Sequence, residues 1–228
     1  LLLTACGGGG GGGAPGTVPS TLSFSLSSGF KSRIQSGATD NFNVTGTCIG
    51  NASIATGASA LATPRFENVA GSIASPQTST LHINFCPAGL GLASGTSTGN
   101  TYYDGTSYVP IGLHVDNGEY SVYVPSLASA LPVKVMGGDS GDIVTLTTYK
   151  DATKLEVTGK RVLSYEINDD TAATVFLDMF TRSYNVGGTL LSTEQTRYRM
   201  AENGNLTMVS INVTSVSPKQ FSLVYTPK

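Results

Sequence analysis

The chain has 228 residues, of which 39% are hydrophobic and only 12% are charged, and its formal net charge is −2. A nucleic-acid-binding surface would need many more basic residues, so this class of function is not expected. No apolar run reaches the roughly 18 residues of a transmembrane helix. The low charge does not indicate disorder, because disordered chains are usually charged and poor in β-branched residues.

The amino-terminal segment from Leu1 to Cys6 passes from apolar to small residues and then to a cysteine, which is typical of the end of a secretory signal peptide. Leu3-Thr4-Ala5-Cys6 resembles the lipobox of bacterial lipoproteins. The resemblance implies that residues 1–5 are a signal-peptide remnant, that the Cys6 sulfur carries a diacylglyceryl group, and that cleavage occurs just before Cys6. In Gram-negative lipoproteins, a residue such as Gly7 after the acylated cysteine favours sorting to the outer membrane, with the body in the periplasm or at the cell surface.

Residues 6–20 form the predicted lipidated cysteine and its tether. Gly7 to Gly13 are seven consecutive glycines, followed by small residues and two prolines. Such a segment cannot pack a core and is expected to be flexible. Because each buried methylene contributes about 0.8 kcal/mol, two or three acyl chains on Cys6 would anchor the protein stably. The expected partner at this end of the chain is therefore a membrane.

Assigning Cys6 to lipid leaves Cys48 and Cys86, each in a stretch of alternating residue character. In an exported protein, such a pair is expected to form a disulfide. Closing this loop would stabilise the fold by about 4 kcal/mol in the chain-entropy model. A metal site is not favoured, because no Cys-x-x-Cys motif or close histidine pair accompanies the two cysteines.

Short runs of β-branched and aromatic residues separated by turn-forming clusters predict an antiparallel all-β protein. No long helical periodicity is visible. In the first half, residues 21–128, the predicted strands are 21–26, 42–48, 50–55, 78–85 and 119–124. Gly/Ala/Ser-rich stretches, 56–63 and 87–100, separate some of them.

Tyr102, Tyr103 and Tyr108 cluster in a region rich in turn-forming residues. Tyrosines exposed on loops bury a large area at low entropic cost. These three are therefore candidate ligand-binding residues, and packing at a domain edge is the alternative.

The second half, residues 129–228, shows clearer strands at 142–149, 161–167, 172–184, 190–200, 205–213 and 220–225. Asn185-Val186-Gly187-Gly188 and Glu202-Asn203-Gly204-Asn205 predict hairpin turns, because Gly and Asn tolerate positive φ. The proline-bounded segment 125–132 is the predicted boundary between two small β-domains. The first is expected to be sandwich-like and the second a meander sheet or half-barrel. One continuous sandwich or barrel is the alternative.

Three segments resemble parts of secreted or lipid-anchored proteobacterial envelope proteins, a group that brings no known activity with it. They are Thr101-Tyr102-Tyr103-Asp104, Tyr108-Val109-Pro110-Ile111-Gly112 and Thr196-Arg197-Tyr198-Arg199.

Gly138-Asp139-Ser140-Gly141 is similar to the nucleophile motif of chymotrypsin-like proteases. His82 and His114 stand too close to Ser140 in the sequence for that fold, so a turn before a strand is favoured. Asp139 and Asp142 are weak candidates for a calcium loop. Paired carboxylates could hydrolyse glycosides, and the candidates are scattered: Glu166, Asp169, Asp170, Asp178, Glu194 and Glu202.

The expected protein is a lipid-anchored envelope protein that acts as a non-catalytic binding or structural module. No catalytic residue and no cofactor is assigned, and the partner beyond the membrane is an unidentified protein or glycan. Two alternatives are an envelope hydrolase that uses carboxylates and a half-barrel carrier of lipid or lipoprotein. Converging carboxylates would mark the hydrolase, and an empty apolar cavity would mark the carrier.

Overall fold

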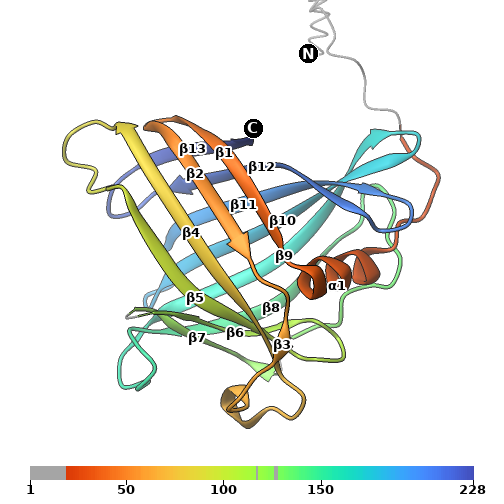
Figure 1. Cartoon of the computed structure of the whole chain (residues 1–228), viewed down its shortest axis with the longest axis horizontal. Helices are drawn as coiled ribbons and strands as arrows, with labels where there is room; N and C mark the ends of the chain where they lie inside the picture. The colour runs from red at the N-terminus through yellow and green to blue at the C-terminus, as the bar shows by residue number, and fades with distance from the viewer. Residues whose placement is uncertain (1–18, 117, 126–127) are drawn as a thin grey trace, which may run out of the picture.

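The computed structural model describes residues 19–116, 118–125 and 128–228 (Figure 1). The predicted signal remnant, Cys6 and nearly all of the predicted tether lie outside these residues. The described elements are α1 (Leu26–Ser36), β1 (Ala38–Gly46), β2 (Ile49–Thr56), β3 (Ala60–Leu61), the 3-10 turn η1 (Phe66–Asn68), β4 (Ile73–Phe85), β5 (Gly95–Tyr103), β6 (Pro110–Val115), β7 (Tyr120–Tyr123), β8 (Ser140–Tyr149), β9 (Val157–Thr171), β10 (Thr174–Asn185), β11 (Leu190–Ala201), β12 (Leu206–Ser215) and β13 (Phe221–Pro227).

Within the described residues, twelve of these strands close into an antiparallel barrel. From β4 to β13 each strand pairs with the next strand in the chain, and β13 then pairs with β1. β1 forms a hairpin with β2, and β2 pairs with β4 to close the ring. The short strand β3 pairs only with the beginning of β4, so it extends the sheet beyond this closing pair.

The all-β antiparallel prediction is confirmed, but the sandwich and the half-barrel are wrong. The segment 125–132 lies between β7 and β8 in the sequence, and these two strands pair directly. β1 and β13 also pair, so strands from 21–128 and from 129–228 share one closed sheet. The predicted domain boundary therefore falls between two neighbouring strands of the same barrel.

The helix α1 and the segment before it fill one end of the barrel (Figure 1). Phe24 and Leu26 are fully buried there in a cluster that includes Val175, Leu177 and Met200. Residues 21–26 were predicted as a strand; Phe24 makes a single β-bridge with Val135, and the helix begins at Leu26. The long loop between β4 and β5 lies at the opposite end (Figure 1).

Cys48 and Cys86 form a disulfide, as predicted. They directly flank the last register pair of β2 and β4, Ile49 with Phe85. The bond therefore fastens the pair of strands that closes the barrel. A second apolar cluster surrounds it, with Val44, Cys48 and Leu223 at its centre and Leu90 and Leu92 from the β4–β5 loop against it.

The strand register separates two faces with different chemistry. Phe42 and Val44 of β1 point inward and are buried, as are Val175 and Leu177 of β10. The alternate, outward positions carry mainly hydroxyl and amide side chains, such as Asn43, Thr45, Asn51, Thr78, Asn100, Thr145, Thr147, Asn212, Thr214 and Ser222. Such side chains suit a face in contact with water. Among the described helices, none is both long and apolar enough to cross a bilayer.

Candidate functional site

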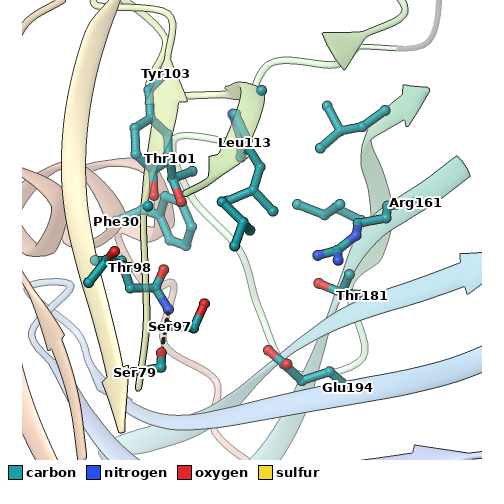
Figure 2. A pocket seen from close by; sticks show the side chains of 17 residues that line it. Phe30, Ser79, Ser97, Thr98, Thr101, Tyr103, Leu113, Arg161, Thr181 and Glu194 are labelled. Atoms are coloured by element: carbon teal, nitrogen blue, oxygen red, sulfur yellow. Dashed lines mark hydrogen bonds between the residues drawn. The ribbon is translucent and has the colours of Figure 1, made fainter. Parts of the chain in front are cut away.

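The interior of the barrel is hollow. The side chains of about eight strands are enough to fill a barrel, and wider barrels leave internal space. Here the ring has twelve strands, and the inward positions of β4 and β5 carry the small residues Ser79, Ser97 and Gly99. A cavity of about 590 Å³ results (Figure 2), lined by Phe30, Gln77, Ser79, Ser97, Thr98, Gly99, Thr101, Tyr103, Pro110, Gly112, Leu113, Val115, Leu146, Arg161, Leu163, Thr181 and Glu194.

Two smaller cavities adjoin the first. One, of about 470 Å³, extends toward the β4–β5 loop and touches Ala93 and Gly95. The other, of about 200 Å³, lies beneath α1 and touches Phe30 and Ile34. Gln77 and Glu194 line all three cavities, so these two side chains stand where the cavities meet. We call the three cavities together the lumen.

Glu194 is the central charged group of the lumen. It pairs in register with Thr181 of β10 and Val213 of β12, on the inward face of β11. The Glu194 side chain is exposed to the solvent space of the cavity, and the surrounding barrel wall desolvates its carboxyl only in part. Among the described residues, the Thr196 hydroxyl donates a long hydrogen bond of 3.5 Å to Glu194 Oε1. Burial raises the pKa of the Glu194 carboxyl, and neither the charge of Arg161 nor the Thr196 hydroxyl restores the ordinary value.

The two arginines that line the lumen are already paired. Arg161 Nη2 donates to Glu119 Oε2 at 2.8 Å, and the Ser121 hydroxyl donates to the other oxygen of Glu119 at 2.9 Å. Arg33 of α1 binds Asp40 at 2.5 Å, and its guanidinium lies 4.9 Å from the centre of the Tyr198 ring. Each positive charge therefore has a carboxylate of its own, and Glu194 has no strong partner in the part of the chain that the structure describes.

Three tyrosines surround this carboxylate region. Burial raises the pKa of Tyr103 to about 12. Burial also raises the pKa of Tyr198 and that of Tyr225, and the negative charge of Glu194 acts in the same direction on both. All three phenols thus stay protonated at neutral pH and can donate hydrogen bonds or present aromatic ring faces.

The predicted tyrosine cluster does not form one site. Tyr103 lines the lumen, whereas Tyr102 lies outside the barrel and stacks on Phe66 at 4.1 Å between ring centres. Tyr108 is buried next to α1, where its hydroxyl accepts a hydrogen bond from Gln35 at 2.8 Å. Adjacent strand residues point to opposite faces, which separates Tyr102 from Tyr103.

The weak metal candidates also fail to converge. The Asp139 carboxylate accepts a hydrogen bond from the Met136 backbone N–H at 2.8 Å and so stabilises the turn before β8. In the described part of the chain, no three side chains of His, Cys, Asp or Glu come together as metal ligands would.

The carboxylates considered for hydrolysis are dispersed as well. Asp178 accepts two hydrogen bonds from Arg197, both at 2.7 Å, on the outward face of β10. Asp170 is bound by Arg199 at 2.6 Å. Glu194 lies inside the barrel, away from these outward pairs, so these three residues do not form the facing pair that glycoside hydrolysis needs.

Sequence reasoning did not single out Arg161, Glu119 or Gln77. A signal was present, however, in the strand alternation. Arg161 shares its face of β9 with Leu163, Tyr165 and Ile167, and Glu194 shares its face with Tyr198 and Met200. A charged residue at one of the alternate strand positions that are otherwise apolar indicates a polar site inside the barrel.

No protein-family model matches the sequence, and no curated protein or solved structure matches the chain. The function must therefore be argued from the lumen itself.

Proposed function

We propose that this chain is a lipid-anchored protein of the bacterial cell envelope whose barrel binds a small molecule without transforming it. The hollow lumen around Glu194 carries this proposal, because it joins an internal space of ligand size to a carboxylate without a strong partner. Converging catalytic groups are not seen among the candidates considered above, which favours binding over hydrolysis.

Two features of the chain support the envelope location. Leu3-Thr4-Ala5-Cys6 resembles a lipobox and is followed by the glycine run. The Cys48–Cys86 disulfide is of the kind that persists in oxidising compartments outside the cytosol. An acylated Cys6 would keep the barrel near a membrane surface, and residues 7–20 would set the distance over which it samples ligands.

A carrier of amphiphilic molecules is the second candidate function. One wall of the 590 Å³ cavity is mainly apolar and carries Leu113, Val115, Leu146 and Leu163, with Arg161 opposite Leu146 in the strand register. A hydrocarbon tail would lie against this wall while its head group reached the polar side of the lumen. Such a carrier would be a closed barrel and not the half-barrel expected from the sequence.

Replacing Cys6 tests the anchor. We expect the Cys6→Ser variant to move from the membrane pellet to the soluble fraction, because the thioether can no longer form. The Thr17→Ser variant is the matched control in the tether and should stay in the pellet until detergent is added. A Cys6→Ser protein that remains in a detergent-extractable pellet would reject lipidation as the means of attachment.

Filling the lumen tests the binding site. Ser97 points into the two larger cavities, whereas Thr78 lies on the outward face of the neighbouring strand β4. We expect 1-hexanol to bind the unmodified barrel and the Thr78→Leu variant equally, and to bind Ser97→Leu at least tenfold more weakly in a calorimetric titration. Equal binding to Ser97→Leu would place hexanol outside the lumen and contradict the proposal.

A further inference from the structure

The chemical class of ligand can be inferred from the charges that line the lumen; this inference rests on the proposed function. Among the described residues, the charged side chains that line the three cavities are Arg33, Arg161 and Glu194. Arg33 is neutralised by Asp40 and Arg161 by Glu119. An ionised Glu194 therefore leaves the lumen with one uncompensated negative charge.

The position of Glu194 makes this charge available to a ligand. The residue belongs to all three cavities, so a molecule in any of them can approach the carboxylate. The Thr196 hydroxyl at 3.5 Å is too distant to satisfy the carboxylate. An ionised carboxylate without an opposite charge or strong donors keeps acceptor sites that the ammonium group of a ligand can fill.

The surroundings of Glu194 fit a cation with an organic tail. The phenol rings of Tyr103 and Tyr225 line the lumen beside it, and aromatic faces attract organic cations. The ring of Tyr198 already has the Arg33 guanidinium 4.9 Å from its centre. The same cavity is lined by the apolar residues Leu113, Val115, Leu146 and Leu163. Figure 2 shows Glu194 and Arg161 extending into the same cavity, with Leu113 facing them from β6.

We propose that the lumen selects a small amphiphilic amine, whose single ammonium group pairs with Glu194 and whose apolar part lies against the wall of Leu113, Val115, Leu146 and Leu163. An anionic head would be repelled by Glu194. A neutral head would leave the carboxylate uncompensated.

Three probes with the same six-carbon tail test this selection. They are n-hexylammonium chloride, 1-hexanol and sodium hexanoate, titrated at equal ionic strength and pH 7.5 and measured by calorimetry. We expect hexylammonium to bind at least tenfold more tightly than hexanol, and hexanoate to bind more weakly than both. This order is measured on the unmodified protein, so it does not depend on whether a variant folds.

Glu194→Gln then tests the assigned residue, because glutamine keeps the shape and removes the charge. We expect hexylammonium affinity to fall to within threefold of hexanol affinity, with hexanol binding unchanged. Glu166→Gln removes the same charge from an exposed, outward position of β9 and should leave both affinities unchanged.

The possible outcomes separate the two proposals. Equal binding of hexanol and hexylammonium, lost in Ser97→Leu, would overturn cation selection while leaving the lumen as the site. Preference for hexanoate would overturn cation selection in favour of an anionic amphiphile. Loss of hexylammonium preference in Glu166→Gln would place the cation outside the barrel. Failure of all three probes to bind would reject both the ligand class and the lumen as a binding site.

Discussion

At the residue scale, the same ionisable side chains serve different roles on the two faces of the wall. Outside, Asp178 is almost completely buried beneath Arg197, which donates two hydrogen bonds to it and packs 4.9 Å from the Phe176 ring centre. Asn168 donates a further hydrogen bond at 2.8 Å. Inside, no comparable set of donors surrounds Glu194 among the described residues. Asp178 is thus a structural carboxylate, and Glu194 is the one left available for a ligand.

Burial raises the pKa of the Asp178 carboxyl, but the hydrogen bonds and charge of Arg197, with the amides of Gln195 and Asn168, outweigh it and hold the pKa below its ordinary value. A lowered carboxyl pKa contributes stability that is fully present above the pKa of the unfolded chain, near 3.8. That contribution disappears as the pH falls through the pKa of the folded protein.

We therefore expect Asp178→Ala to lower the free energy of unfolding by about 1–3 kcal/mol at pH 7, because buried donors lose their acceptor while Arg197 can still turn partly to water. The difference from the unmodified protein should shrink as the pH falls below about 4. Urea unfolding at several pH values measures this, with the exposed turn residue Glu202→Ala as the control. A gap that stays constant down to pH 2 would show that the ionised pair is not its source.

The residue types could suggest which polar side chains face the lumen, but they could not show which of these side chains lacks a partner. Tyr102 and Tyr103 are adjacent in an apparent loop, and only the existence of β5 assigns them to opposite faces. Glu194 was one of several scattered carboxylates. Its importance depends on which arginines are already paired, and that requires contacts between residues distant in sequence, such as Arg161 with Glu119.

At the element scale, strands with regular apolar alternation were predicted well, and β5, whose sequence lacks this alternation, was missed. β8 to β13 agree with the predicted runs to within a few residues, and both predicted hairpin turns are present. β5, Gly95–Tyr103, begins with Gly, Thr and Ser, so its sequence is typical of a loop. Its inward residues face a cavity, and the usual apolar alternation is therefore absent.

The helix α1 was missed for a related reason. Its mean character is polar, and the fold stabilises it through a close tertiary contact. A Cβ atom added at Gly29 would lie 2.0 Å from the carbonyl oxygen of Gly204, in the turn between β11 and β12. The helix can approach this turn only because Gly29 has no side chain.

We expect Gly29→Ala to lower the free energy of unfolding by about 1–3 kcal/mol, because the helix must move away from the turn and from its apolar contacts. Gly95→Ala is a suitable control, since an added Cβ there meets no atom within 4 Å. It should change stability by less than about 0.5 kcal/mol. Thermal or urea unfolding measures both variants. Equal stabilities of the two would mean that the helix tolerates displacement at this contact.

At the scale of the whole molecule, the closed ring makes the two halves of the sequence one structural unit. β7 pairs with β8 across the predicted boundary, and β1 pairs with β13. Local sequence patterns define strands but carry little information about which distant strands meet. The choice between two domains and one barrel therefore could not be made from alternation and turn signals.

We expect residues 19–228 to unfold in a single cooperative transition, with coincident curves from far-ultraviolet circular dichroism and tyrosine fluorescence. A fragment of residues 129–228 should remain unfolded, because β8 and β13 would lose β7 and β1 and leave both sheet edges unpaired. Two separated transitions, or an independently folded fragment, would contradict the one-unit description.

The pairing of β1 with β13 also determines when the barrel can close relative to synthesis of the chain. β1 can form its hairpin with β2 early, but its other edge waits for the last strand of the sequence. The wall cannot be completed while carboxyl-terminal residues are still being synthesised or translocated. Long-range pairing of this kind delays folding. Under the proposed envelope location, the chain would cross the membrane before its barrel is complete, and the proposed ligand would be acquired only after export.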